Sequence, residues 1–156
     1  MELIKDVSQG SFGNLEGMVW FGLFDKYIRF SVDDSADLDY VRMCGNYLND
    51  LPEETIKSLW EASKRYCNGF LEAIGEPSKV FEKDSDIINL IYPSTLIVPD
   101  PGNGDEPVIW MELNCEWDPE HGMEWVVRGD QVLYVGGFNG TDPWASISKE
   151  DSWNYA

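Results

Sequence analysis

The sequence predicts an α+β fold, an antiparallel sheet with two main helices packed on one face. Alternating apolar and polar residues predict strands towards both ends of the chain, and helical periodicity predicts helices between them. This order of strands, helices and strands is typical of an antiparallel sheet rather than of alternating β-α units. Seven Trp, seven Tyr and seven Phe residues support a packed core, because disordered chains hold few aromatic residues.

In the first third of the chain, the sequence predicts a short strand followed by two longer ones. Residues 8–17 form a Gly-rich turn region, and residues 18–24 form a strand whose two apolar faces predict a central or doubly covered position. Asp25-Lys26 is the expected two-residue turn. Residues 27–32 then alternate as a half-buried antiparallel strand. Its apolar face consists of Ile28, Phe30 and Val32.

A first helix is predicted to open within residues 33–37. Asp34 or Ser35 serves as its N-cap, and the acidic residues there favour the positive end of the helix dipole. Apolar residues recur along one face at helical spacing. They are Tyr40, Met43, Cys44, Tyr47 and Leu51.

A second, longer helix carries the clearest boundary signals. Asp50 and Glu53 have the spacing of a capping box, and Pro52 falls in the first turn. Gly75 is expected to end the helix in the left-handed conformation. The apolar stripe consists of Ile56, Leu59, Trp60, Cys67, Phe70, Leu71 and Ile74.

The last third of the chain returns to strand signals. Residues 80–92 fit a short helix or a strand, and residues 95–98 form a short strand. A polar loop over residues 100–105 precedes an alternating strand over residues 109–116. Two further strands within residues 123–135 form a hairpin around a Gly-Asp turn.

We predict one domain over residues 1–137 and an irregular tail, rich in Trp, Gly and Asp, over residues 138–156, packed on or beside that domain. Trp144 and Trp153 either pin the tail or meet a partner, and pinning is favoured. The Trp residues inside periodic elements are interpreted as core residues. They are Trp20, Trp60, Trp110 and Trp125.

Charge is the dominant property of the whole chain. With 29 acidic residues against 11 basic ones, the formal net charge is −18. Direct binding of nucleic acids or anionic membranes is excluded, because both require Lys and Arg. A basic protein partner would instead be attracted and would associate faster. The alternative is a scaffold protein whose charge only keeps it in solution.

We expect a cytoplasmic protein in a reducing compartment. No secretory signal is readable, and the longest apolar stretches are far too short to span a membrane. Cys44, Cys67 and Cys115 are odd in number and widely spaced, so they are interpreted as small buried apolar groups. A disulfide is the alternative.

The sequence favours a non-catalytic protein without a cofactor. His121 is the only histidine, so the chain offers few ligands for a zinc site and only one possible base for a His-paired nucleophile. The chain contains no Walker loop, dinucleotide fingerprint, CxxC or nucleophile elbow.

The densest polar segment joins two predicted strands over residues 116–122. Glu116, Asp118, Glu120 and His121 could hold a hard cation or act as acid and base, but they match neither EF-hand nor zinc spacing. We interpret the segment as a hairpin connection in which His121 bonds to a nearby carboxylate or carbonyl. A partner-binding loop and a metal-dependent enzyme centred on residues 116–121 are the alternatives.

Candidate partner-binding residues fall into two groups, and the acidic loop over residues 100–106 is a further docking patch. A solvated surface is the alternative for each acidic group. The first group is Asp33, Asp34, Asp37 and Asp39, and the second is Glu116, Trp117, Asp118, Glu120 and His121.

Three sequence strings carry a resemblance to a known family. They are Phe12-Gly13-Asn14-Leu15, the Cys-Glu-Trp-Asp-Pro-Glu-His-Gly string over residues 115–122, and Tyr134-Val135-Gly136. Over most of residues 10–137 the chain resembles small bacterial proteins of unknown function that look like those encoded beside polymorphic and contact-dependent toxins, some of which serve as immunity proteins. The resemblance implies an inhibitor that binds a cognate basic toxin, such as a nuclease, and blocks its active site or substrate groove.

Overall fold

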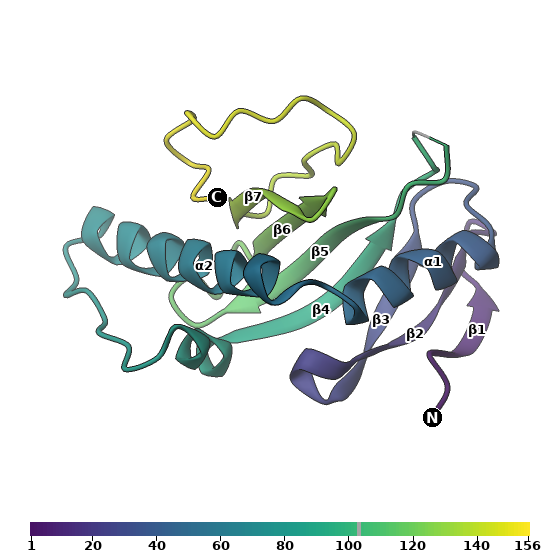
Figure 1. Ribbon diagram of the computed structural model, residues 1–156, viewed down its shortest axis with the longest axis horizontal. Helices are drawn as coiled ribbons and strands as arrows, with labels where there is room; N and C mark the ends of the chain where they lie inside the picture. Colours follow the sequence, from purple (N-terminus) through teal and green to yellow (C-terminus); the bar gives the residue numbers. More distant parts are fainter. Residues whose placement is uncertain (103) are drawn as a thin grey trace.

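The computed structural model describes residues 1–102 and 104–156 and contains one seven-stranded sheet (Figure 1). The strands lie in sequence order, and every neighbouring pair is antiparallel except β3 and β4, which are parallel. The α+β class and a mostly antiparallel sheet are therefore confirmed. The parallel pair departs from the predicted antiparallel sheet, because the helices between β3 and β4 return the chain to the end of the sheet where β3 began.

The elements have the following bounds. The strands are β1 (Ile4–Gln9), β2 (Leu15–Phe21), β3 (Lys26–Val32), β4 (Ile91–Val98), β5 (Val108–Cys115), β6 (Met123–Arg128) and β7 (Gln131–Gly137). The α-helices are α1 (Leu38–Asn49) and α2 (Glu53–Ala73), and the 3₁₀ turns are η1 (Gly22–Phe24) and η2 (Asp84–Leu90).

The connection between β2 and β3 differs from the predicted two-residue turn. Strand β2 begins and ends earlier than expected, and η1 followed by Asp25 at φ 53° replaces the Asp25-Lys26 turn. The reason is a tertiary contact from α1. The Asn49 side chain accepts the Gly22 N–H at 2.7 Å and donates to the Trp20 carbonyl at 2.8 Å, which ends the strand at this point.

Strand β2 is an interior strand paired with both β1 and β3, which agrees with one of the two predicted alternatives, whereas the other alternative, cover on both faces, is not observed. Val19 and Phe21 are buried, whereas Met18 and Trp20 are half-buried. Trp20 packs edge-on against Tyr27 of β3, with ring centroids 5.2 Å apart. Trp20 is therefore not a core residue. On β3, the predicted buried face is confirmed.

Helix α1 is capped by Asp37 rather than by Asp34 or Ser35. The Asp37 carboxylate accepts the Tyr40 N–H at 2.9 Å. Ser35 lies before the helix, where its N–H and hydroxyl donate to Asp100 in the β4–β5 loop. The buried face also differs from the predicted one, since Met43 is 39% exposed. The buried residues of α1 are Tyr40, Val41, Cys44, Gly45 and Leu48.

Helix α2 lacks the predicted capping box. Asp50 instead ends α1 by donating its N–H to the Tyr47 carbonyl, and Pro52 occupies the N-cap of α2 without a side-chain bond. Gly75 has φ 76°, as predicted for a left-handed end. The predicted apolar stripe extends too far, since Ile74 is 56% exposed.

The last four strands follow the sequence signals with one extension. Strand β4 begins at Ile91 instead of Thr95, because a register shift between Pro93 and Thr95 accommodates a proline that cannot donate to the ladder. The uncertain stretch before it contains η2. The Gly-Asp turn between β6 and β7 is confirmed, with positive φ at both Gly129 and Asp130. Asn103, part of the predicted polar loop, lies outside the described residues.

Two apolar clusters stabilise the fold. The large one takes side chains from every strand and both helices, and includes Trp60 and Trp125. Helix α1 packs on β2, β4 and β5, and α2 packs on β7 and η2. The small cluster comprises Trp110, Val126 and Tyr134, with Ile147 of the tail packed against it. The three cysteines are buried and free, as interpreted from the sequence. They are Cys44, Cys67 and Cys115.

Residues 138–156 form neither helix nor strand and run as loops beside β7 (Figure 1). Trp144 is pinned, because its Nε1 donates to the Asp100 carbonyl at 2.9 Å. Trp153 is 56% exposed, so the expected pinning fails there. Among the described residues, no helix is both long and apolar enough to cross a membrane.

Candidate functional site

The two predicted groups of site residues lie at opposite ends of the sheet. Strands β3 and β4 are parallel, so the acidic segment after β3 meets the loop after β4 at one end. Strand β5 runs back antiparallel to β4, which places residues 116–122 at the other end. A single site containing both groups is therefore excluded by topology. We call the first end, with its loops over residues 33–39 and 99–106, the acidic end.

The acidic end joins two loops that are far apart in sequence. The Asp100 carboxylate accepts the Ser35 N–H at 2.9 Å and faces the Ser35 hydroxyl at 3.3 Å, across 65 positions of the chain. Tyr40 donates its hydroxyl to the Glu106 carbonyl at 2.6 Å. Burial raises the pKa of this hydroxyl, so Tyr40 remains a neutral donor. These bonds fix the two acidic loops relative to each other.

A pocket of 500 Å³ opens between these loops and the start of α1. Its lining combines carboxylates with apolar and small surfaces, and none of the described residues that line it is Lys or Arg. The carboxylates are Asp37, Asp39, Asp100 and Asp105, and the other lining residues are Ser35, Ala36, Tyr40, Met43 and Pro101. None of the ion pairs between described residues involves these carboxylates. The pocket therefore combines concentrated negative charge with apolar surface.

A second hollow of 360 Å³ shares Asp100 with this pocket. It contains the other two predicted carboxylates, Asp33 and Asp34, together with Asp142 and Trp144 of the tail. All four predicted residues of the first group thus line one of two hollows that share Asp100. Sequence reasoning treated the 100–106 loop as a separate patch and missed Asp142, because no local signal indicates which loops meet.

A fully exposed aromatic side chain stands at the acidic end. Phe12, at the tip of the β1–β2 turn, is 96% exposed. The neighbouring Asn14 donates its Nδ2 to the Val32 carbonyl at 3.2 Å and the Asp33 carbonyl at 3.4 Å, which holds the tip beside the acidic loop. The sequence prediction did not include this exposed apolar side chain among the candidate partner-binding residues.

The 116–122 segment is a hairpin connection with local bonds. His121 Nδ1 lies 3.0 Å from Asp118 Oδ1, the expected bond to a nearby carboxylate. Tyr92 donates its hydroxyl to Glu116 at 2.6 Å, and Trp117 packs edge-on against Tyr66 at 5.4 Å. Glu120 is exposed. Within residues 1–102 and 104–156, no three His, Cys, Asp or Glu side chains converge as metal ligands would.

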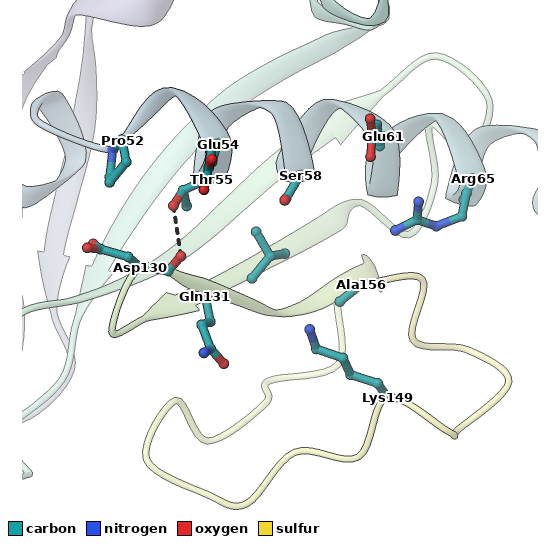
Figure 2. A pocket seen from close by; sticks show the side chains of 11 residues that line it. Pro52, Glu54, Thr55, Ser58, Glu61, Arg65, Asp130, Gln131, Lys149 and Ala156 are labelled. Atoms are coloured by element: carbon teal, nitrogen blue, oxygen red, sulfur yellow. Dashed lines mark hydrogen bonds between the residues drawn. The ribbon is translucent and has the colours of Figure 1, made fainter.

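Another pocket, of 490 Å³, lies between α2, the β6–β7 turn and the tail (Figure 2). Arg65 of α2 and Lys149 of the tail extend into the space beneath the helix, and Glu54 and Glu61 of α2 also line the pocket. The Thr55 hydroxyl donates to the Asp130 carbonyl at 2.7 Å and closes one end. Charges of both signs line this pocket, so it offers less selectivity for a charged partner than the acidic end does.

The structure also contains a buried carboxylate that sequence reasoning missed. Glu124 on β6 is fully buried and accepts the Trp110 Nε1–H at 2.9 Å. The Thr141 N–H and hydroxyl also bond to this carboxylate, at 3.2 and 2.6 Å. The only sequence signal for a buried carboxylate here is a glutamate within an otherwise apolar strand. Glu124 thereby attaches the beginning of the tail to the sheet, and we call this group of bonds the Glu124 clasp.

Comparison with known proteins places most of the chain within one family model. The model described as Domain of unknown function (DUF6985) matches residues 7–143. It therefore covers both ends of the sheet and the Glu124 clasp, whereas most of the tail follows the matched region. No curated protein and no solved structure matches the chain.

Proposed function

The chain belongs to the DUF6985 family, and from that premise we propose that it is a non-catalytic, immunity-type inhibitor acting in the cytoplasm. It binds a basic protein toxin through the acidic end of its sheet. The observation that supports this most directly is the pocket of 500 Å³, whose lining includes four carboxylates and no Lys or Arg.

The chemistry of this pocket matches a Lys or Arg side chain of the partner. An aliphatic stem packs on Met43, Ala36 and Pro101, while the cationic head meets Asp39 and Asp105. These two carboxylates are exposed and have no hydrogen-bond partner among the described residues. A cation brought by the partner therefore does not have to displace an existing ion pair, which would offset part of the binding energy.

Phe12 supplies an apolar contact next to these charges. Exposed aromatic side chains become energetically dominant when a partner covers them, whereas charges at a rim mainly accelerate association. The net charge of −18 steers a basic toxin towards the chain, and Phe12 slows dissociation. A toxin that binds phosphates presents such a basic surface, so occupation of that surface would exclude its substrate.

We further infer that α1 and α2 cover the same face of the sheet, which leaves the acidic end open to a partner. Buried side chains of both helices belong to one continuous cluster, and Trp110, Val126 and Tyr134 form a separate cluster with the tail. This arrangement supports binding through loops rather than through a helix face.

The test compares two charge-matched variants in binding to the toxin encoded beside this chain. Asp39→Asn/Asp105→Asn removes two unpaired carboxylates from the pocket, and Glu72→Gln/Glu76→Gln removes two exposed carboxylates elsewhere. We expect the first pair to slow association about tenfold at low salt and the second about twofold or less. Wild-type association should also slow steeply as salt increases.

Equal effects of the two double variants would place the contact elsewhere on the surface. If the chain bound the toxin quickly at a rate independent of ionic strength, electrostatic capture would be contradicted, but the proposed inhibition would not be. Substrate turnover by the purified chain, abolished by His121→Ala, would replace the inhibitor with an enzyme centred on the opposite end of the sheet.

A further inference from the structure

We propose that Asn139-Gly140 is a site of spontaneous deamidation whose products weaken the Glu124 clasp and loosen the C-terminal tail. This inference is independent of the proposed inhibitor role. It depends on the exposure of the Asn139-Gly140 pair, on the contacts of Asn139 with the clasp, and on the contrast with a second Asn-Gly pair in α2.

The reaction needs only the chain itself and water. The Gly140 main-chain nitrogen attacks the side-chain carbonyl carbon of Asn139, and an N–C bond forms while the carboxamide C–N bond breaks. The Gly140 N–H proton leaves with the departing nitrogen as ammonia, which closes a succinimide ring. Water then opens the ring at the side-chain carbonyl to give aspartate, or at the main-chain carbonyl to give isoaspartate.

The local structure permits this attack. Asn139 and Gly140 are both exposed and lie in a segment without helix or strand. Gly140 has φ 71°, and a Cβ at this position would meet no atom within 4 Å outside its chain neighbours, so no distant segment packs against this side of the Gly140 Cα. Among the hydrogen bonds between described residues, none engages the Gly140 N–H.

A second Asn-Gly pair in the same chain is held in an unreactive arrangement. Asn68 and Gly69 lie within α2, where main-chain N–H groups donate to carbonyls four residues earlier. Both polar atoms of the Asn68 amide are occupied, since Oδ1 accepts the Lys79 N–H at 2.8 Å and Nδ2 donates to the Lys79 carbonyl at 3.1 Å. Reaction at Asn68 therefore requires local unfolding of the helix.

Deamidation at Asn139 acts directly on the clasp. The Thr141 hydroxyl lies 2.6 Å from Glu124 Oε1 and 2.7 Å from Asn139 Oδ1, and its one hydrogen can serve only one of them. An amide can turn its NH₂ group towards the hydroxyl and supply a second hydrogen. A carboxylate has none to supply, and it adds negative charge beside the fully buried Glu124.

Loosening of the clasp would also change the acidic end. Gly140, Asp142 and Trp144 line the hollow that contains Asp33 and Asp34. When the tail leaves, Trp144 loses its bond to the Asp100 carbonyl and two walls of this hollow are removed. As deamidation accumulates with time, it would thus change the shape of the hollow that contains Asp33 and Asp34.

The first experiment follows deamidation in the folded full-length chain by mass spectrometry of tryptic peptides. Cleavage after Lys and Arg places Asn139 in peptide 129–149, Asn68 in peptide 66–79 and Asn103 in peptide 84–128, so each pair is read separately. We expect Asn139 to convert at least about tenfold faster than Asn68, because helix α2 must open before Asn68 can react. In denaturant the two sites should react at similar rates. Equal rates in the folded chain, or no conversion at Asn139, would overturn the proposal.

The second experiment measures the effect on the tail by hydrogen exchange. Asn139→Asp reproduces one product, and Asn139→Gln keeps an amide but reacts far more slowly because a larger ring must close. We expect exchange in residues 141–156 to accelerate about tenfold in Asn139→Asp, the effect of losing one hydrogen bond to a charged group. The Asn139→Gln variant should stay near wild type. Unchanged exchange in Asn139→Asp would show that deamidation does not reach the clasp.

Discussion

Replacement of Asn154 with Ala removes the side chain that fastens the end of the tail to strand β7. Asn154 is 7% exposed, and its amide makes four bonds. Nδ2 donates to the Leu133 carbonyl at 2.9 Å and the Ser148 carbonyl at 3.0 Å. Oδ1 accepts the Val135 N–H at 3.3 Å and the Ala156 N–H at 3.0 Å.

The expected loss in free energy of unfolding follows from these contacts. A hydrogen bond contributes about 0.5–1.5 kcal/mol net, because the freed groups regain water. The Ser148 and Ala156 groups belong to the tail and can rehydrate, whereas the Leu133 and Val135 groups lie on β7 beneath it. We therefore expect a loss of about 2–3 kcal/mol. For a chain of this length, that loss lowers the melting temperature by about 5–10 °C.

Thermal unfolding monitored by circular dichroism provides the assay, and Asn46→Ala provides the matched control. Asn46 is exposed on α1, so its replacement should change the free energy of unfolding by about 0.5 kcal/mol or less. If Asn154→Ala had the same melting temperature as Asn46→Ala, the Asn154 side chain would not hold the tail in place, and the reasoning from its four bonds would be wrong.

Three further outcomes are expected. Glu124→Ala should lower the free energy of unfolding by about 3 kcal/mol in urea titrations, because buried donors lose their acceptor, while Glu124→Gln should cost less than half of that. Phe12→Ala should leave stability within about 0.5 kcal/mol but accelerate dissociation from the partner, as measured by surface plasmon resonance. Burial raises the pKa of Cys67 to about 11, so folding keeps this thiol protonated. The protonated Cys67 thiol contributes fully to stability below the unfolded-state pKa, and this contribution disappears as the pH rises towards 11. Urea titrations across this pH range should therefore show a fall in the free energy of unfolding, and the fall should be smaller in Cys67→Ala.

Local patterns predicted the elements that depend on neighbours along the chain. Period-two alternation located the β6–β7 hairpin, and the positive φ values of its Gly129-Asp130 turn follow from residues that tolerate them. Gly75 ended α2 for the same reason. The three cysteines were correctly interpreted as buried free thiols from their number and spacing.

Boundaries failed where a distant segment competes for the same groups. Ser35 is a residue type that favours the N-cap, but bonds to the distant Asp100 hold it in the loop before the helix, and Asp37 caps α1 instead. The failure at Asp50 is local instead: this residue had capping-box spacing for α2, but its N–H donates to the Tyr47 carbonyl three residues earlier and closes α1. The β2–β3 connection follows the bonds of Asn49 rather than the preference of Asp25 for a turn.

The sequence by itself determined the charge, the α+β class, the succession of strands and helices, and the acidic residues around position 35, because these depend on composition and on periodicity between near neighbours. Only the tertiary structure decided that residues 33–39 and 99–106 share one pocket while residues 116–122 lie at the opposite end of the sheet. It alone placed the buried Glu124 beneath Thr141 and joined Asn14, in the turn that carries the exposed Phe12, to the Val32 and Asp33 carbonyls. The physical reason is the pairing of β3 with β4, which is parallel and joins segments that no local pattern connects.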